Sequence, residues 1–523
     1  MAGFLERTVS AAAGAIERTV ASEASCRAPG LLQTIDPRVK IVAFAALILA
    51  ASLTRSAAVL ACLYALATLL ALLSRIAVLE FTKRIWIFVP LFTAVVALPA
   101  LFLTPGARIA SLGPVAVTDA GARAALLLVL RVSTSVSFSV LLVLTTPWHR
   151  LLEALGGLRL PGIVVSLLSL SYRYLLLLLR TLSELLLARR SRIIAPLAFR
   201  HEAAFVSRSA GFLFLRSLHL AEGVHLAMVS RGWEDDAPSR PGGTEAAAFA
   251  HAPRERAFEL RGVRYAYPGN LPALAIDELD IARGRCTILL GSNGSGKSTL
   301  LKVLDGLLFP QTGTVEAFGR PLSEKALEDR GFRRAFRSTV GLVFQDADVQ
   351  CFSPTVREEL AFGPRQMGLD EPEIARRVGD ALAALGIAAL ADRYPYHLSG
   401  GEKKRVALAS ILTLDLDAYL LDEPTANLDP AAEGILIDIL SGLAARGRTL
   451  VVATQDLMLA RHIGGDAIIL GPGKSPLFTG DVERALADAA LLERAGLAHA
   501  HRRSHREAPA EFRHSHYLED KES

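Results

Sequence analysis

One segment of the chain has residue types suited to holding phosphate. Residues 286–290 (CTILL) form a short apolar run that predicts a buried strand, and residues 291–299 (GSNGSGKST) follow it directly. Glycines let backbone N–H groups curve around an anion, and a following helix adds its dipole. The pattern matches the GxxxxGK[ST] phosphate-binding loop in the strand–loop–helix setting that it requires. We therefore expect a nucleotide to bind here.

The side chains of this loop have predicted tasks. Lys297 is expected to reach the β- and γ-phosphates, and Ser298 to ligate Mg²⁺. ATP and Mg²⁺ are thus the predicted cofactors. The other expected phosphate-binding positions are Gly291, Ser292, Asn293, Gly294, Ser295, Gly296 and Thr299.

A second apolar run, residues 418–421 (AYLL), ends in two carboxylates. Asp422 is expected to hold Mg²⁺, directly or through water. Glu423 is expected to orient and deprotonate the attacking water. Such a pair alone is a weak signal, but together with the phosphate-binding loop it predicts ATP hydrolysis.

Residues 398–402 (LSGGE) lie about 20 residues before this carboxylate pair and resemble the signature of ATP-binding-cassette (ABC) ATPases. The resemblance covers roughly residues 257–485 and implies an α/β P-loop ATPase with a helical subdomain. It also implies that the signature of one ATPase domain completes the nucleotide site of a second domain. The signature residues implied to bind ATP are Ser399, Gly400, Gly401 and Glu402.

The same resemblance implies roles for three residues outside these motifs. Gln345 matches the Q-loop, which senses Mg²⁺ and the membrane domain, and Asp429 lies in the D-loop. Tyr267 matches the aromatic residue that stacks on adenine, although an ordinary strand tyrosine is the alternative. One position departs from the family. Gln455 stands where a histidine contacts the γ-phosphate, and glutamine donates a hydrogen bond without carrying charge.

The first half of the chain is strongly apolar, and the whole chain has a mean hydropathy of +0.36 with 21% charged residues. Residues 41–53, 57–74, 85–103 and 124–145 are candidate membrane spans in an all-α domain. Basic residues before the first span and between the second and third predict a cytoplasmic N-terminus. We expect a multi-pass protein of the cell (inner) membrane with a cytoplasmic ATPase. The net charge of +5 comes without a basic stripe, so nucleic acid is not an expected partner.

Two longer stretches, residues 161–195 and 203–230, are apolar but interrupted by charges. They predict amphipathic helices, partly embedded and partly on the cytoplasmic face, although a further pair of spans remains an alternative. Arg192 and Arg231 lie near their ends. The guanidinium group of either arginine could dock into a groove on a partner, whereas the alternative is an ordinary juxtamembrane arginine.

The segments LLQTIDPRVK, before the first span, and AMVSRGW, residues 227–233, resemble the transmembrane T component of energy-coupling factor (ECF) transporters. The N-terminal half is most similar to the cobalt/nickel branch, and the ATPase resembles ECF ATPases in residues 345–350 and 355–363. The resemblance implies that Arg192 and Arg231 couple the membrane domain to ATPases. It also implies two partners, a separate membrane substrate-binding (S) subunit and a second ATPase domain, from another copy or a paralogue.

These patterns divide the chain into a membrane domain with coupling helices (1–233), a flexible linker (234–256), the ATPase (257–485) and a His-rich tail that is expected to be disordered (486–523). The tail holds five of the 12 histidines, which favours a transition metal as the substrate, although a solvated basic tail is the alternative.

The predicted function is the coupling and ATP-hydrolysing subunit of an ECF importer for cobalt or nickel. The alternatives are an importer for a vitamin such as biotin, a membrane-anchored ABC ATPase without a transport role, and half of an exporter. An exporter half would require about six long spans, which exceeds the number predicted here.

Overall fold

The computed structural model describes residues 30–76, scattered positions between 81 and 99, most of 104–158, and residues 162–190, 199–233 and 255–498. Contacts divide the chain into two compact units, Met1–Leu218 and His219–Ser523. The boundary falls within one helix, so the last turns of that helix belong to the second unit. Residues 234–254 of the predicted linker, residues 499–523 of the predicted tail and most of the third predicted span lie outside the described residues. The predicted tail begins at residue 486, but its first part is folded, since Ala489–Arg494 form the helix α21 with Leu491 and Leu492 buried.

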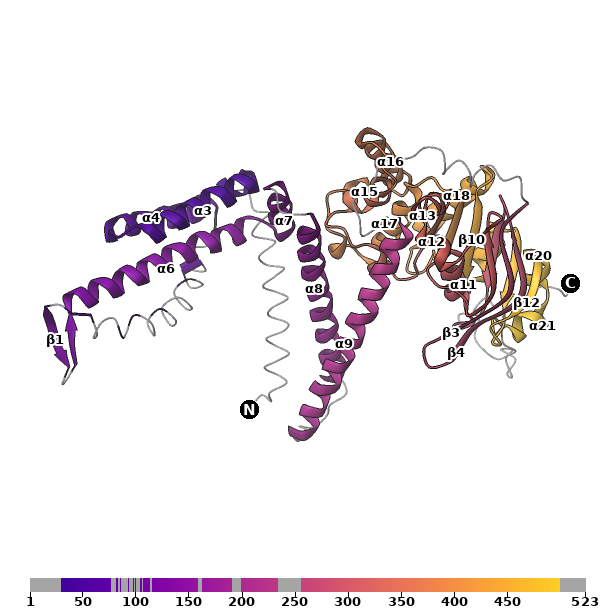
Figure 1. Cartoon of the computed structure of the whole chain (residues 1–523), viewed down its shortest axis with the longest axis horizontal. Helices are drawn as coiled ribbons and strands as arrows, with labels where there is room; N and C mark the ends of the chain where they lie inside the picture. Colours follow the sequence, from indigo (N-terminus) through magenta and orange to yellow (C-terminus); the bar gives the residue numbers. More distant parts are fainter. Residues whose placement is uncertain are drawn as a thin grey trace, which may run out of the picture. The chain divides into compact units, whose positions relative to one another are not determined.

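The described part of the first unit is mainly helical (Figure 1). The first predicted span lies in α3 (Pro37–Leu53), which is longer than its apolar run because Pro37 follows an Asp36 cap. Phe44 of α3 packs against Phe138 of α6 with ring centroids 5.6 Å apart. The helices are α2 (Leu31–Thr34), α3, α4 (Ala57–Leu73), α6 (Asp119–Thr145), α7 (Trp148–Gly157), α8 (Gly162–Arg190) and α9 (Phe199–Ser230).

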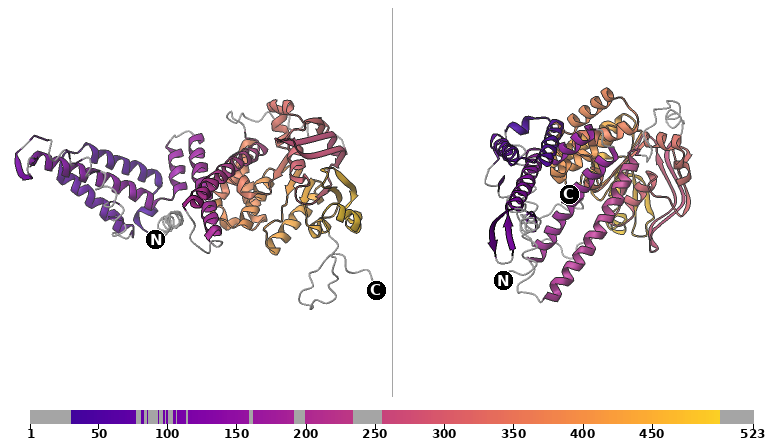
Figure 2. Two further views of the ribbon diagram at one scale, coloured as in Figure 1. Left: turned by 90° about the horizontal axis from the view of Figure 1, so that it is seen from below. Right: turned by 60° about the vertical axis from the view of Figure 1, so that its left-hand side comes forward.

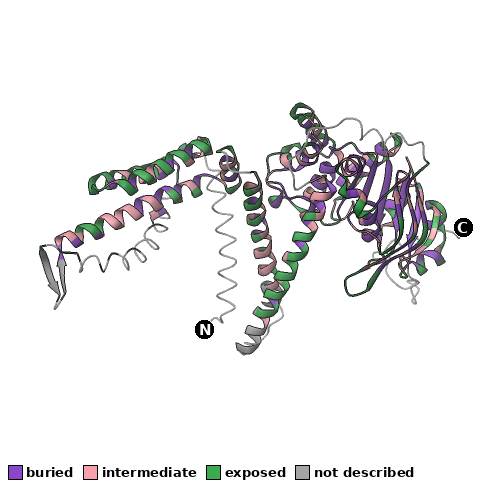
Figure 3. Cartoon of the chain, viewed as in Figure 1, coloured by how far each residue is buried: buried purple, intermediate pink, exposed green. Residues whose placement is uncertain are grey.

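Two described helices are long and apolar enough to cross a membrane: α6, and residues Ser207–Ser230 of α9. The fourth predicted span lies within α6, whereas α4, which carries the second, is shorter. Figure 3 shows many exposed residues on α3 and α4. Several are large and apolar, such as Leu49 and Leu69, as expected of helices that face lipid. An antiparallel pair of strands, β1 (Arg108–Leu112) and β2 (Val115–Thr118), lies between the third and fourth predicted spans and was not predicted from the sequence.

The second unit is built on two sheets (Figures 1 and 2). The larger has the strand order β12-β11-β5-β10-β9-β8, and its strands are parallel except for β12. The smaller is antiparallel, with the order β4-β3-β6-β7. The strands are β3 (Arg256–Tyr267), β4 (Leu271–Ala282), β5 (Cys286–Leu290), β6 (Thr312–Ala317), β7 (Arg320–Pro321), β8 (Val340–Val343), β9 (Ala418–Asp422), β10 (Thr449–Thr454), β11 (Asp466–Leu470) and β12 (Pro476–Asp481).

Every residue of β5, β8, β9 and β10 is buried, as expected of parallel strands covered on both faces. Helices complete the unit: α11 (Lys297–Leu304), α12 (Glu324–Glu328), α13 (Arg330–Arg337), α14 (Ala347–Gln350), α15 (Val356–Gln366), α16 (Glu371–Ala384), α17 (Gly400–Leu412), α18 (Pro430–Ala445), α19 (Leu457–Ile463), α20 (Val482–Ala487) and α21 (Ala489–Arg494).

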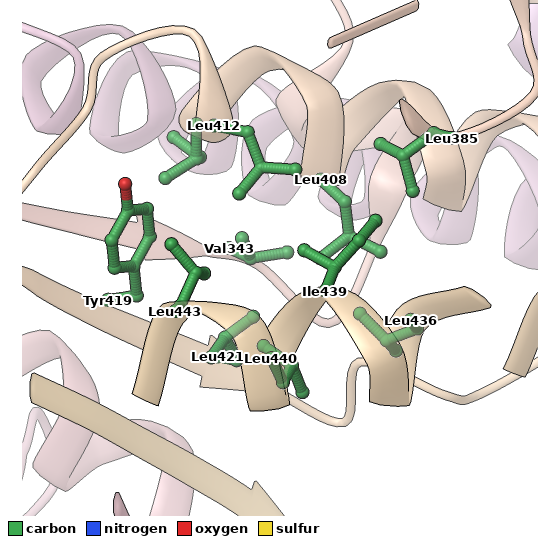
Figure 4. Close-up of a pocket in the computed structure, with 11 residues that line it drawn as sticks. Val343, Leu385, Leu408, Leu412, Tyr419, Leu421, Leu436, Ile439, Leu440 and Leu443 are labelled. Carbon is green, nitrogen blue, oxygen red and sulfur yellow. The ribbon is translucent and has the colours of Figure 1, made fainter. Parts of the chain in front are cut away.

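Apolar side chains join the helices of this unit to its sheet. Figure 4 shows Leu408 of α17, Leu440 of α18, Val343 and Leu421 among the side chains that surround a cavity of about 10 Å³. This volume is about that of one water-sized probe, so the cavity is a packing feature of the core. Since β5, β8, β9 and β10 are parallel neighbours, their carboxyl ends share one edge of the sheet, where ligands bind in open α/β sheets. The predicted motifs that follow these four strands therefore meet at that edge.

Candidate functional site

The phosphate-binding loop joins β5 to α11. Gly296, which precedes the helix, has φ +106°, and a Cβ there would lie 2.5 Å from the carbonyl oxygen of Ala273. Only glycine fits this position, because both the backbone conformation and the close approach exclude a side chain. Lys297 begins α11, and its Nζ donates hydrogen bonds to the carbonyl oxygens of Gly291 (2.6 Å) and Ser292 (3.3 Å). The lysine is thus held across the loop that it is predicted to serve.

The two predicted carboxylates lie beside this lysine. Glu423 Oε1 is 3.9 Å from Lys297 Nζ, and Glu423 Oε2 accepts a hydrogen bond from the Thr454 hydroxyl at 3.3 Å. Burial raises the pKa of Glu423, whereas Lys297 lowers it. Burial also lowers the pKa of Lys297. A carboxylate whose pKa is raised towards neutrality in a cleft is suited to accept a proton from water.

Asp422 has the features of a cation ligand. Burial raises the pKa of its carboxyl group, and a hydrogen bond with the Ser298 side chain is the largest effect that lowers it. Its Oδ1 is buried and has no hydrogen-bond partner among the described residues. A buried, unsatisfied carboxylate oxygen next to a serine hydroxyl fits a hard divalent cation with oxygen ligands. The predicted pair of Asp422 and Ser298 therefore lies together in the structure.

These groups line a single pocket of about 290 Å³. Gln345, which follows β8, contributes to the same pocket. Tyr267 lies at the pocket 37% exposed, with its hydroxyl 3.2 Å from Thr299 Oγ1. Lys474, which was not predicted from the sequence, also lines the pocket and donates a hydrogen bond to the Gly294 carbonyl oxygen. An isolated lysine in a Gly/Pro-rich loop carries no sequence signal for this position.

The signature lies elsewhere, because its residues are absent from the lining of this pocket. Ser399 caps α17 in a capping box, in which its hydroxyl accepts from Glu402 N–H and its own N–H donates to Glu402 Oε2 at 2.7 Å. Ser399 and Gly400 are exposed, so the helix N-terminus is open to a ligand supplied from outside. Asp429 caps α18 by accepting from Ala432 N–H, and Gln455 is exposed after β10.

Arg231 occupies a buried socket within the second unit. Its Nη1 lies 2.5 Å from Glu359 Oε1, and its Nη2 donates to the Gln350 carbonyl oxygen. Its guanidinium carbon also lies 4.5 Å from the ring centroid of Phe352 and 5.5 Å from that of Phe362. A guanidinium group is suited to such a place, because its flat faces stack on rings while its edges donate hydrogen bonds.

The socket is itself fixed to the nucleotide site. Glu359 Oε2 accepts hydrogen bonds from the N–H groups of Phe352 (2.8 Å) and Ser353 (2.6 Å). The Gln350 side chain accepts from Phe344 N–H, immediately before Gln345, and donates to the Ala407 carbonyl oxygen of α17. Gln350 therefore connects Arg231 with the Q-loop and with the signature helix.

A second buried ion pair lies close to the end of α9. Asp305, at the C-terminal end of α11, is 3.1 Å from Arg337 Nη1, and both side chains are almost inaccessible to solvent. Burial raises the pKa of Asp305 to about 6, while Arg337 and the Ser230 side chain lower it. A Cβ added at Gly232 would lie 3.9 Å from Arg337 Cβ. The segment around Arg231 thus packs near both α11 and the socket.

Comparisons with known proteins agree with both halves of this description. Residues 30–241 match the family model described as cobalt transport protein, and residues 274–426 match the model described as ABC transporter. The chain is 50% identical over 244 residues to the nickel import ATP-binding protein NikO of Rhodobacter capsulatus. The matched residues make up 46% of this chain and 95% of that relative. The chain belongs to the energy-coupling factor class of ABC transporters.

Other relatives carry similar names. The energy-coupling factor transporter ATP-binding protein EcfA2 of Methanospirillum hungatei is 44% identical over 243 residues, which are 46% of this chain and 60% of that protein. The nickel import ATP-binding protein LarO of Lactiplantibacillus plantarum is 43% identical over 212 residues, or 40% of this chain and 88% of that protein. These matches confirm the family that the sequence motifs predicted, a T-component-like membrane domain joined to an ECF-type ATPase.

Within this ECF chain, the structure brings most of the predicted site residues together and leaves others apart. The loop residues, Gln345, Asp422 and Glu423 meet at one sheet edge, whereas the signature and Asp429 do not line the pocket. Arg231 was predicted from the sequence but its contacts were not, because its partner Glu359 is 128 positions away. Arg192 lies outside the described residues, so its predicted coupling role remains a prediction.

Proposed function

We propose that this chain is the coupling and ATP-hydrolysing subunit of an importer for cobalt or nickel ions. The observation that carries the proposal is the seating of Arg231, at the end of the membrane-type domain, in a buried socket of the ATPase. A chain that merely anchored an ATPase to a membrane would have no need of such a contact. Substrate class rests on the cobalt transport family model and on the relatives with nickel import names.

The nucleotide site suggests how hydrolysis would proceed. The backbone of residues 291–299 and Lys297 would hold the phosphates of ATP, and Tyr267 would stack on the adenine. Ser298, Asp422 and Gln345 would hold Mg²⁺, which neutralises charge on the phosphates when bound. Glu423 would take a proton from the attacking water, and Thr454 and Lys297 fix its carboxylate. Gln455 would donate a neutral hydrogen bond near the γ-phosphate.

A second ATPase domain is part of the proposal. The amides of Gly400 and Gly401, next to Ser399, lie at an exposed helix N-terminus, away from the pocket of their own domain. Such a terminus favours an anion, so it is suited to the γ-phosphate of ATP bound by another ATPase, while Glu402 caps the helix. Asp429 of the D-loop would act at the same interface between the two ATPase domains. That ATPase would be another copy of this chain or a paralogue.

Coupling would pass through the end of α9. When the two ATPases close on ATP, the elements that hold Gln345 and α17 would move, and Gln350 would carry that movement to Arg231. Arg192 would make the corresponding contact of the other coupling helix. The membrane domain would then tilt or release a separate substrate-binding (S) subunit. We place the protein in the cell (inner) membrane as a multi-pass protein, with the ATPase in the cytoplasm.

Co-purification and uptake test this proposal together. The full chain would be expressed with candidate S subunits, and cells would be supplied with labelled cobalt, nickel or biotin. We expect an S subunit to co-purify and cobalt or nickel uptake to depend on the chain. Biotin uptake without metal uptake would overturn the metal assignment and favour a vitamin importer. Intact ATPase activity with no transported substrate and no S subunit would favour a membrane-anchored ATPase.

A further inference from the structure

Lys404 is a buried lysine that the proposed function does not use. It lies on α17, two residues after the signature, and is only 2% exposed. Its Nζ donates hydrogen bonds to three carbonyl oxygens: Phe344 (3.1 Å), Gln345 (3.2 Å) and Asp422 (3.2 Å). An ammonium group has three N–H donors, so these contacts use its full capacity. Burying a charged group costs free energy unless it is hydrogen-bonded, and here the three carbonyl oxygens supply those hydrogen bonds.

The three acceptors belong to the two loops that handle the reacting end of ATP. Phe344 and Gln345 follow β8 and form the Q-loop, whereas Asp422 ends β9 immediately before Glu423. Both loops line the nucleotide pocket. Lys404 therefore joins the signature helix to both loops through their backbone, leaving the side chains of Gln345 and Asp422 free to face the pocket.

The hydrogen bond to Asp422 acts on an unusual peptide. Glu423 has φ +45°, a left-handed conformation that residues with a side chain seldom adopt. Such a conformation persists where surrounding contacts hold it. The Asp422–Glu423 peptide is held at both ends, because its carbonyl oxygen accepts from Lys404 Nζ and its N–H donates to the Ala453 carbonyl oxygen at 2.9 Å. The direction of the Glu423 carboxylate depends on this peptide.

We propose that Lys404 is a positioning residue for ATP hydrolysis. Its hydrogen bonds fix the Asp422–Glu423 peptide and the Gln345 backbone in position relative to the signature helix. Lys404 does not line the nucleotide pocket, so it would act without touching the nucleotide. It acts on the orientation of the Glu423 carboxylate and of the Q-loop, and therefore on the hydrolysis step. The inference rests on the proposed role of Glu423 as the general base.

Steady-state ATPase measurements on the full chain, purified with its partners, test this inference. Lys404→Met keeps the length of the side chain but removes all three donors, and Lys404→Gln retains an amide that can donate two. We expect kcat to fall by about 10- to 100-fold in Lys404→Met, because a misdirected catalytic group costs factors of this size. Lys404→Gln should retain more activity. Binding of fluorescent ADP, which lacks the γ-phosphate, should be unchanged in both variants.

Two reference variants make the outcomes distinguishable. Lys403→Met alters the neighbouring lysine, which pairs with Asp348 at 2.7 Å and donates to neither loop, so its kcat should match the wild type. Glu423→Gln should abolish hydrolysis, and if it does not, the proposed general base is wrong, whatever Lys404 does. If Glu423→Gln is inactive but Lys404→Met keeps wild-type kcat, only the present inference is overturned. Equal losses of kcat, ADP affinity and melting temperature in Lys404→Met would show a purely structural lysine and would also overturn it.

Discussion

Replacing Arg231 by methionine perturbs the proposed coupling contact most directly. The change removes a guanidinium group whose side chain is 1% exposed and leaves the buried carboxylate of Glu359 without its charged partner. Removing one member of a buried ion pair costs about 3–5 kcal/mol. Here Glu359 keeps its hydrogen bonds from Phe352 and Ser353, so the lower end of that range applies.

A cost of about 3 kcal/mol lowers the equilibrium constant for docking the end of α9 into its socket by roughly 100-fold. The assay is uptake of labelled metal and hydrolysis of ATP, measured on the same proteoliposomes. We expect Arg231→Met to lower metal uptake per ATP hydrolysed, because hydrolysis would continue without reaching the membrane domain. Arg231→Lys should be intermediate, since it keeps the charge but loses the planar fork.

Arg365→Met is the matched control. Arg365 also pairs with a carboxylate, Glu371, but this pair is exposed and contributes little. Its uptake per ATP should equal that of the wild type. A double variant with Glu359→Gln should lose little more than Arg231→Met alone, because the two residues act as one contact. An unchanged ratio of uptake to hydrolysis in Arg231→Met would refute the coupling role of this arginine.

Three further predictions concern the ATPase. Tyr267→Ala should raise KM for ATP by about tenfold with little change in kcat, as expected for the loss of a base-stacking contact of about 1–3 kcal/mol. Tyr267→Phe should resemble the wild type. Equal effects of the two substitutions would show that the hydroxyl group, and not the ring, binds ATP. Gln455→His should preserve or raise the ATPase rate, and a sharp loss would show that glutamine is tuned for this protein. Because burial raises the pKa of Asp305 to about 6, the folded chain binds a proton that the unfolded chain has already released between pH of about 4 and 6. The stability of the wild type should therefore fall relative to that of Asp305→Asn as the pH rises through this window. Thermal unfolding of both proteins at several pH values measures this difference, and a stability difference that does not change with pH would contradict the prediction.

Much of the ATPase site could be predicted because its parts are contiguous motifs attached to strands. The loop of residues 291–299 follows β5, and the Asp422–Glu423 pair ends β9 and begins the next turn. Parallel neighbouring strands bring such motifs to one edge, so the local sequence already implies their proximity. The composition of the first half similarly indicated a membrane domain, although the strands β1 and β2 were not foreseen.

The contacts that join these motifs could not be predicted in this way. Lys404 stands in a run of charged residues, EKKR, which ordinarily indicates a solvated helix face, and only the packing of α17 against β8 and β9 buries it. Glu359 similarly lies in an ordinary helical stretch, and its pairing with Arg231 depends on a fold that brings distant segments together. Specific polar contacts between distant segments leave no periodic pattern in a single sequence.

The central claim is that one chain joins ATP hydrolysis to metal import, and reconstituted transport tests it most directly. The complex with its S subunit would be placed in proteoliposomes, with ATP supplied to the side of the ATPase, and accumulation of labelled cobalt and nickel would be followed over time. The proposal predicts accumulation of one of these metals that requires ATP and disappears in Glu423→Gln. Metal entry that is equal with and without ATP, or that survives Glu423→Gln, would contradict it.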